Sequence, residues 1–403
     1  MKVGRGYYII GGRATIKITN GAEIFGGLIS SGTVSIPYAR QAPIKVEGEL
    51  EVDLDGGYVI QLPFNPIPRS WSESLKLFSG GDSYLIIGGV DVGKSGYTLY
   101  ISNKLISKGL KVGIIDTDIG QSDLGPPGTI GSAIMDKYYY NYVDIPLYNA
   151  YFIGDKMPTG HLLQIVIGTY KLHKELVRNT DIQIINTSGF IRGGPAKALK
   201  VGIADVIEPD KIFVLDREGE TRHIIDALSR KYEIVKLEVP KALKPKRIWE
   251  RRGYRRYYIE RFLKNPKRIK LSLDEINIEN TAIHNTCMRI YRGYKYGMYY
   301  DGEKLRVFSY GNIPEEIRRE LVEGLNIRRY SFIDVSRLKG LIIGLYREDK
   351  FLNIGLLEGL DLFKREISIL TNVDEKVDRI VFGYVIYDSS YNEVVRLRPG
   401  FLG

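Results

Sequence analysis

Residues 83–95 read SYLIIGGVDVGKS, a short apolar run that leads into a glycine-rich loop. Residues 94–109, KSGYTLYISNKLISKG, then have the length and spacing of a helix. Gly88 to Ser95 fit the pattern G-x-x-x-x-G-K-[ST] completely, and this pattern needs a strand before it and a helix after it. The stretch therefore predicts a phosphate-binding loop at the start of an α/β domain.

The residue types of the loop suit a nucleoside triphosphate. Glycines let successive backbone N–H groups point inward, and the helix N-terminus adds partial positive charge. Lys94 supplies a cation for the β and γ phosphates, and the Ser95 hydroxyl completes a magnesium shell. We therefore expect a nucleoside triphosphate and Mg²⁺ at this loop. The expected nucleotide-binding residues are Gly88, Gly89, Val90, Asp91, Val92, Gly93, Lys94, Ser95 and Gly96.

A pair of aspartates follows the next apolar run, at Asp116 and Asp118. An aspartate at the tip of the adjacent strand is where a magnesium-organising carboxylate belongs. Two aspartates separated by one residue project on the same side of an extended chain. One of them can therefore orient magnesium or its water while the other approaches a nucleophile.

Around these motifs the chain reads as three segments. Residues 1–72 hold short β-branched or aromatic runs separated by Gly and Asn, which predict a small all-β domain. Residues 73–270 alternate apolar runs with helical patterns, including a crossover helix at 161–179, and predict a P-loop domain with a central parallel sheet. Residues 271–403 return to strand patterns with one helix at 314–325, so we expect a β-rich C-terminal domain.

The positive charge is concentrated in one place. Residues 241–270 carry 13 basic and 2 acidic side chains, so the rest of a chain with net charge +10 sums to −1. Such a segment concentrates phosphate-bearing ligands, either nucleic acid or the charged tail of a nucleotide. A solvated surface helix, or a tail that binds polyanions without specificity, is the alternative interpretation.

Composition excludes several classes of protein. A single cysteine excludes an intramolecular disulfide and a multi-cysteine zinc site. No run approaches the roughly 18 uncharged apolar residues of a membrane helix, and the N-terminal stretch is too broken by Gly and Arg for a signal peptide. We expect a cytoplasmic protein without a membrane partner.

Four motifs together resemble the polynucleotide 5′-hydroxyl kinase family of Clp1 and Grc3. They are GGVDVGKS at 88–95, IIDTDIGQSDLGPPGTI at 114–130, NTSGFIRGG at 186–194 and the arginine-rich stretch. The likeness covers nearly the whole chain and is sharp over about 85–260. It implies transfer of the ATP γ-phosphate to the 5′-hydroxyl end of RNA or DNA, single-stranded or duplex, together with protein partners in RNA processing.

The resemblance also implies roles for the acidic motif and for its neighbours. Asp118 best matches the residue that activates the 5′-hydroxyl, and Asp116 acts on magnesium through water together with Ser95; the reverse assignment of the two aspartates stays open. Gln121 joins the substrate-binding residues. The family commonly has a second hydroxyl after the loop serine, where this chain has Gly96. The catalytic residues implied are Lys94, Asp118, Arg247, Arg251 and Arg252.

Three further residues are implied at the substrate. Phe190 replaces a family tryptophan that stacks on a base, and a phenyl ring still offers a stacking face. Thr159 and His161 resemble a clasp that grips the 5′ end. Two other interpretations stay open, namely Phe190 as a core aromatic residue and His161 as a helix cap or surface residue.

The arginine-rich segment, about 241–265, resembles the family's lid, whose arginines close over the transferring phosphoryl group. Arg247, Arg251 and Arg255 are four residues apart and would share one face of a helix. Guanidinium groups suit the equatorial oxygens of that phosphoryl group. Arg247, Arg251 and Arg252 align best with the lid arginines, and we expect Arg255 to follow the nucleic-acid backbone.

Two other functions fit a P-loop. A non-catalytic member of the family would hold ATP as a structural element of an RNA-processing complex, but it would not need to keep Lys94, Ser95, Asp118 and the arginines together. An unrelated P-loop ATPase that drives a partner would leave the lid and the GPPG sequence unexplained. The kinase is the leading hypothesis.

Overall fold

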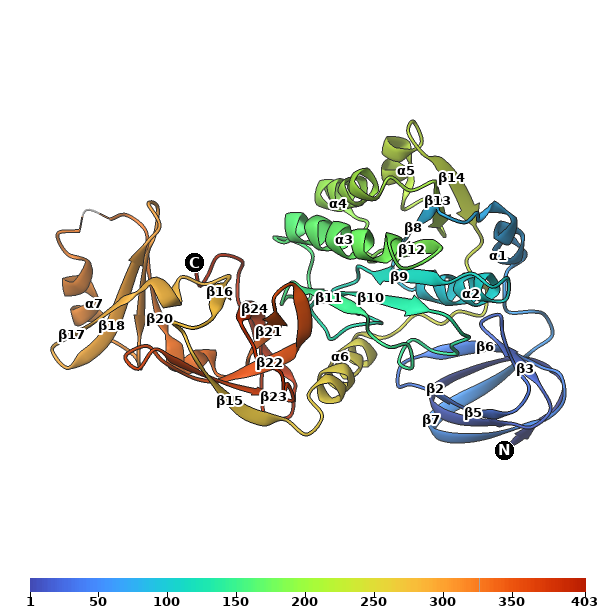
Figure 1. The fold of residues 1–403 in the computed structure, drawn as a ribbon, viewed down its shortest axis with the longest axis horizontal. Helices are drawn as coiled ribbons and strands as arrows, with labels where there is room; N and C mark the ends of the chain where they lie inside the picture. Colours follow the sequence, from blue (N-terminus) through green and yellow to red (C-terminus); the bar gives the residue numbers. More distant parts are fainter. Residues whose placement is uncertain (326) are drawn as a thin grey trace. The chain divides into compact units, whose positions relative to one another are not determined.

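The computed structural model describes residues 1–325 and 327–403, which form two compact units, Met1–Tyr258 and Ile259–Gly403 (Figure 1). The first unit holds an N-terminal sheet and a central sheet with helices. Within the described ranges, no helix combines the length and the apolar character that a membrane span requires.

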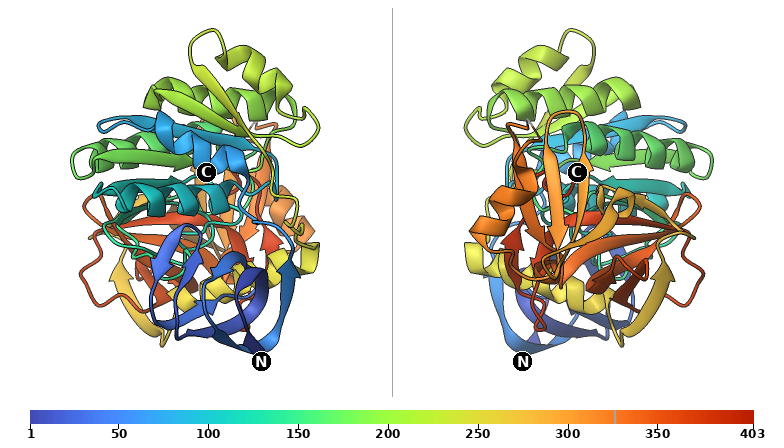
Figure 2. Two further views of the ribbon diagram at one scale, coloured as in Figure 1. Left: turned by 90° about the vertical axis from the view of Figure 1, so that its right-hand side faces the viewer. Right: turned by 90° about the vertical axis from the view of Figure 1, so that its left-hand side faces the viewer.

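Strands within residues 2–62 form the N-terminal sheet, which Figure 2 shows in blue as a curved layer of its own. On β2 (Gly6–Ile18), Ala14 and Ile16 are buried while Thr15 and Lys17 are exposed. This period of two buries one face of the sheet. The other strands are β1 (Lys2–Val3), β3 (Ala22–Ile24), β4 (Gly27–Ile29), β5 (Gly32–Ile36), β6 (Gln41–Val46) and β7 (Leu50–Leu62), in the order β1-β7-β2-β6-β3-β4 with β5 paired to β2.

The central sheet has the strand order β11-β10-β9-β12-β8-β13-β14. The fold is α/β, as predicted, but the expected parallel sheet is a mixed one, because β10 pairs antiparallel with both β9 and β11. The buried segment 117–128 turns the chain back after β9 without a crossover helix, so β10 must run the other way. The strands are β8 (Ser83–Gly88), β9 (Val112–Asp116), β10 (Thr129–Met135), β11 (Asn149–Phe152), β12 (Ile182–Asn186), β13 (Lys211–Leu215) and β14 (Glu233–Leu237).

Helices cover both faces of the central sheet (Figure 1). One face packs against α2 (Lys94–Ile106), and the other against α3 (Leu162–Val177), α4 (Gly193–Ile207) and α5 (Arg222–Leu228). Because the sheet is apolar on both sides, its strands are continuous hydrophobic runs. The short α1 (Arg69–Glu73), followed by a 3-10 turn at Ser74–Leu77, links the N-terminal sheet to β8.

The second unit contains two sheets, which Figure 2 shows in orange and red. The larger sheet has the order β15-β23-β22-β21-β24-β16 with β25 on β24, and the smaller has the order β17-β18-β19-β20. The predicted helix forms as α7 (Glu315–Val322) and packs Ile317 and Leu321 on the smaller sheet. The strands are β15 (Lys267–Ser272), β16 (Asn277–Glu279), β17 (Cys287–Tyr291), β18 (Tyr294–Tyr300), β19 (Leu305–Ser309), β20 (Tyr330–Asp334), β21 (Leu341–Arg347), β22 (Lys350–Asp361), β23 (Glu366–Thr371), β24 (Arg379–Tyr387) and β25 (Glu393–Arg396).

One helix belongs to both units. The basic segment forms α6 (Ile248–Phe262), and the boundary between the units falls between its residues Tyr258 and Ile259. The residues of α6 up to Tyr258 are part of the first unit and of the site described below.

Candidate functional site

The glycine-rich loop connects β8 to α2 as the sequence predicts. Gly93 has φ of +100°, in the region that favours glycine, and a Cβ there would lie 3.2 Å from the ring of Pro240. The buried Lys94 curls back so that its Nζ donates to the carbonyl of Gly89 across 2.5 Å. Burial lowers the pKa of Lys94, and nearby carboxylates, Asp118 first, oppose that shift. The amino group of Lys94 therefore lies against the backbone of the loop that precedes it.

Three predicted residues, Ser95, Asp116 and Asp118, lie together where β9 and β12 end. These strands pair in parallel, so Asn186 lies beside Asp116. The Asn186 Nδ2 atom lies 3.3 Å from both Ser95 Oγ and Asp116 Oδ1, and the backbone N–H of Asp118 donates to Asp116 Oδ1 across 3.1 Å. Burial, and then the Asp118 carboxylate, raises the pKa of Asp116 to about 8. Such a carboxylate is poised to be stabilised by a cation.

The oxygen atoms at this corner fit magnesium. Among the described residues, Asn186 Oδ1 is buried without a hydrogen-bond partner, and the Nδ2 atom of the same side chain contacts the carboxylate of Asp116 and the hydroxyl of Ser95. Mg²⁺ prefers oxygen ligands and usually takes one or two carboxylates together with phosphates and water. No group of three or more His, Cys, Asp or Glu suited to a metal occurs within the described ranges. The donor set thus suits Mg²⁺ bound together with a nucleotide.

Asp118 lies at the edge of this corner and lines a cavity of the first unit. Its Oδ1 atom accepts the backbone N–H groups of Gly120 and Gln121, each across 3.1 Å. The Gln121 side chain in turn accepts from Lys246 Nζ across 3.4 Å. Backbone hydrogen bonds therefore fix the direction of the Asp118 carboxylate.

The lid segment reaches the loop through two residues. Arg251 Nη2 donates to Asp91 Oδ2 across 2.7 Å, and the backbone N–H of Lys246 donates to the same oxygen across 3.0 Å. Within the described ranges, the Nε atom of Arg251 is buried and has no hydrogen-bond partner. Arg247 and Arg252, predicted to share its role, are exposed, and the half-buried Arg255 lies one turn further along α6.

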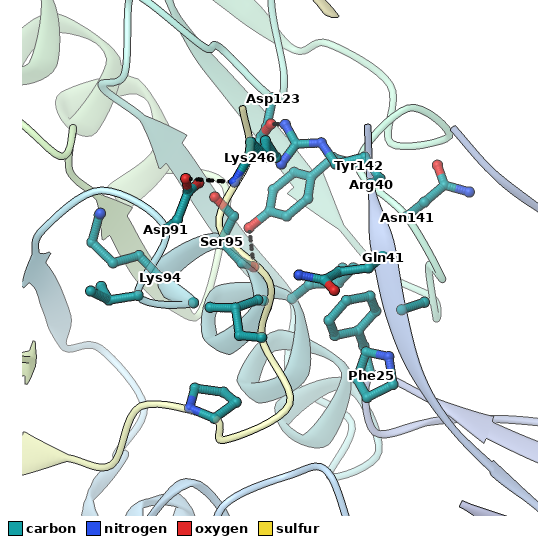
Figure 3. A pocket seen from close by; sticks show the side chains of 18 of the residues that line it. Phe25, Arg40, Gln41, Asp91, Lys94, Ser95, Asp123, Asn141, Tyr142 and Lys246 are labelled. Atoms are coloured by element: carbon teal, nitrogen blue, oxygen red, sulfur yellow. Dashed lines mark hydrogen bonds and ion pairs between the residues drawn. The ribbon is translucent and has the colours of Figure 1, made fainter. Parts of the chain in front are cut away.

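A cavity of about 170 Å³ separates the N-terminal sheet from the loop (Figure 3). Its lining comes from both sides, with Phe25 and Gln41 from the N-terminal sheet domain and Lys94 and Ser95 from the start of α2. The Tyr142 hydroxyl closes one side by donating to the backbone oxygen of Ser95 across 2.9 Å. Other residues that line the cavity are Trp71, Leu99, Asn141 and Pro240.

Besides Arg255, three predicted substrate residues lie outside this cavity lining. His161 Nε2 and Asp155 Oδ2 are 2.8 Å apart, and both side chains are buried just before α3. Thr159 is exposed nearby. Phe190 is half-buried and packs against the core beneath α3 and α4. Their contact with substrate stays a prediction.

Several residues at the site carry no local sequence signal. Arg40 of the N-terminal sheet domain forms an ion pair with Asp123, and the Tyr254 hydroxyl of α6 donates to the same carboxylate across 2.8 Å. Lys200 of α4 is fully buried, and its Nζ donates to the backbone oxygen of Ser188 across 2.7 Å. Asp123 lies inside the motif at 114–130 and Tyr254 inside the arginine-rich segment, but neither motif indicates that these two residues and Arg40 meet.

The chain is similar to proteins of known family. The model for the mRNA cleavage and polyadenylation factor CLP1 P-loop matches residues 88–265. The polyribonucleotide 5′-hydroxyl-kinase of Pyrococcus abyssi is 30% identical over 320 residues, which cover 75% of this chain and 86% of that protein. Its namesake in Methanocaldococcus jannaschii is 27% identical over 355 residues, covering 81% of this chain and 94% of that protein.

A solved structure shares the fold. The structure of the wild-type Clp1p–Pcf11p (454–563) complex contains a chain that covers 96% of this one and 97% of its own length, with a TM-score of 0.66 at 12% identity. At such low identity the likeness shows the fold alone.

Proposed function

The chain belongs to the polynucleotide 5′-hydroxyl kinase family of Clp1 and Grc3, and from this premise we propose that it transfers the γ-phosphate of ATP to the 5′-hydroxyl of RNA. The observation that carries the proposal is the contact between the lid arginine Arg251 and the loop residue Asp91, beside Lys94 and Asp118. Phosphoryl transfer needs these parts in one place, because it proceeds by positioning and charge stabilisation.

The phosphates would lie along the N–H groups of the loop. Lys94 would leave the carbonyl of Gly89 for the β and γ phosphates, since a phosphate oxygen is a stronger acceptor for its ammonium group. Ser95 and Asp116 would hold magnesium, which when bound neutralises charge that develops on the transferred group. The Asp118 carboxylate would accept the proton of the 5′-hydroxyl as that oxygen attacks in line.

Arg251 would complete the site by exchanging partners. In the present arrangement its Nη2 binds Asp91, while its buried Nε has no acceptor among the described residues. A γ-phosphate on the loop offers three oxygens and more negative charge than one carboxylate, so the guanidinium would bind it preferentially. Arg252 and Arg255 of the same helix, and Arg247 just before it, would contact the substrate strand.

The cavity would receive the adenine. Its walls combine the apolar side chains of Phe25, Leu99 and Pro240 with the amides of Gln41 and Asn141. A base stacks on apolar and aromatic surface and is recognised by a few placed amide groups. This would place part of the nucleotide specificity in the N-terminal sheet domain.

Thr159, His161 and Phe190 would contact the acceptor end. Asp155 holds the His161 ring in place, which would orient the exposed Thr159 beside it. The half-buried ring of Phe190 would stack on the terminal base.

The test is a transfer assay with γ-labelled ATP, magnesium and matched 5′-hydroxyl RNA and DNA oligonucleotides. We expect label on the 5′ end of RNA, lost in Lys94→Ala and kept in Lys108→Ala, a matched change at an exposed lysine just after α2. ATP retained without any transfer by the wild type would contradict the kinase and favour the ATP-holding scaffold. We also propose that this chain has protein partners, as Clp1p has in its complex with Pcf11p.

A further inference from the structure

We propose that Asp123 is a positioning residue that couples the lid helix and the N-terminal sheet domain to the magnesium corner at Asp116. The inference rests on the proposed kinase function, since it concerns the site that function uses. Asp123 lies just after the stretch from Asp116 to Gln121 and is almost fully buried. Its contacts run to three parts of the first unit.

The carboxylate of Asp123 joins the N-terminal domain to α6. Arg40, from the segment between β5 and β6, forms an ion pair with Asp123 and also donates to the Tyr254 hydroxyl. The Arg40 guanidinium lies 4.4 Å from the centre of the Tyr254 ring. The Tyr254 hydroxyl itself donates to Asp123 Oδ1 across 2.8 Å. This closed set of three side chains forms only when both Arg40 and α6 are docked.

A second tyrosine of α6 reaches the same residue. The Tyr258 hydroxyl donates to the backbone carbonyl of Asp123 across 3.3 Å. Tyr254 and Tyr258 lie one helical turn apart, with ring centres 4.5 Å from one another. The helix therefore holds both the side chain and the backbone of Asp123.

The backbone of Asp123 continues the connection to the metal corner. Its N–H donates to Asp116 Oδ2 across 2.6 Å, while the N–H of Asp118 and the amide of Asn186 contact the other oxygen. The direction of the Asp116 carboxylate is thus set partly by the position of residue 123. A displacement of α6 would move that donor and with it the magnesium ligand.

The coupling follows from burial. Arg40 and Asp123 are largely removed from water, so loss of one partner leaves a buried charge uncompensated. Partners that orient a metal ligand typically change metal affinity or activity by about 10-fold to 100-fold when they are removed. We therefore expect the docking of α6 on Asp123 to change the affinity of the site for magnesium.

The experiment measures ATP binding by calorimetry, once with magnesium and once with EDTA, in Tyr254→Phe and in the wild type. The variant removes one hydroxyl, so we expect the strengthening of ATP binding by magnesium to fall about tenfold, with ATP affinity in EDTA unchanged. Turnover should fall in parallel. Tyr257→Phe is the matched control, because Tyr257 is half-buried on the same helix and contacts only the ring of Tyr258 in the described interactions.

Two outcomes would overturn the inference. An unchanged magnesium effect in Tyr254→Phe would show that α6 does not act on the metal corner. An equal loss of ATP affinity with and without magnesium would show that the hydroxyl only supports the fold. Neither outcome affects the kinase proposal, which Lys94→Ala tests separately. Asp123→Asn should reduce the strengthening of ATP binding by magnesium more than Tyr254→Phe does. If Asp123→Asn does not fold, Tyr254→Phe alone tests the inference.

Discussion

The guanidinium of Arg251, on α6, donates to the carboxylate of Asp91, in the phosphate-binding loop, across 2.7 Å. The two residues are far apart in the sequence, and their contact brings the basic segment directly over the loop. Among Arg247, Arg251 and Arg252, Arg251 is the one whose side chain contacts a loop residue in the part of the chain that the structure describes.

Arg251→Ala should therefore lower kcat by about 100-fold to 1000-fold, the usual cost of losing a donor to transition-state charge. The KM for ATP should change little, because the arginine would act on the transferring group. Arg252→Ala should instead raise the KM for RNA, with a dependence on salt that the Arg251 variant lacks. Steady-state kinetics measure both, with the exposed Arg230→Ala as control; equal effects of the two lid variants on kcat would contradict the assignment.

Asp118→Asn should abolish transfer while ATP binding survives. The amide cannot take the proton of the 5′-hydroxyl, so the rate should fall by about 100-fold to 10,000-fold. Calorimetry with saturating magnesium gives the affinity for ATP. Lost ATP binding in that variant would move Asp118 to the metal and Asp116 to the hydroxyl.

Phe190→Leu keeps an apolar side chain of similar bulk but removes the flat ring. If the ring stacks on a base, the KM for RNA should rise by about 5-fold to 150-fold, corresponding to the usual 1–3 kcal/mol of base stacking. Thermal unfolding of the same variant should be close to that of the wild type. The reverse pattern, with lower stability and an unchanged KM, would identify Phe190 as a core residue.

His173 predicts how stability depends on pH. Its Nε2 atom lies 2.7 Å from Ser83 Oγ, which donates to Gln183, and burial lowers the pKa of His173 to about 4. The unfolded chain therefore binds more protons between pH 4 and the ordinary histidine value of about 6.5. The stabilisation is present above that value and is lost as pH falls through the window, by at most about 3 kcal/mol. Denaturant unfolding of His173→Gln should show a flatter pH profile over this window.

Local chemistry explains why the loop could be predicted. Strand, glycines, lysine and helix follow one another within residues 83–109, and each element has its own pattern. The same holds for Asp116 at its strand end and for α3 and α7. The alternation of β2 likewise predicts its buried face, since that pattern needs no partner to be recognised.

Long-range contacts explain what could not be predicted. Arg40 meets Tyr254 across 214 residues, and neither side of that contact has a local pattern. The direction of β10 depends on a turn, since its residues read equally well in either orientation. His161 resembles an accessible ligand in the sequence, but its burial against Asp155 comes from how the segment before α3 folds.

The two compact units share α6, and this limits where chimeras between this chain and its relatives can be joined. In a chimera joined at the unit boundary, the sequence of one relative would give way to that of another between Tyr258 and Ile259, in the middle of α6. The better junction is the short turn after Phe262, where Asn265 has φ of +50° and the next strand begins at Lys267. Exchanging the chain from that turn onward keeps all of α6 together with the loop that it contacts. The C-terminal unit can then be replaced without changing the sequence of the lid segment.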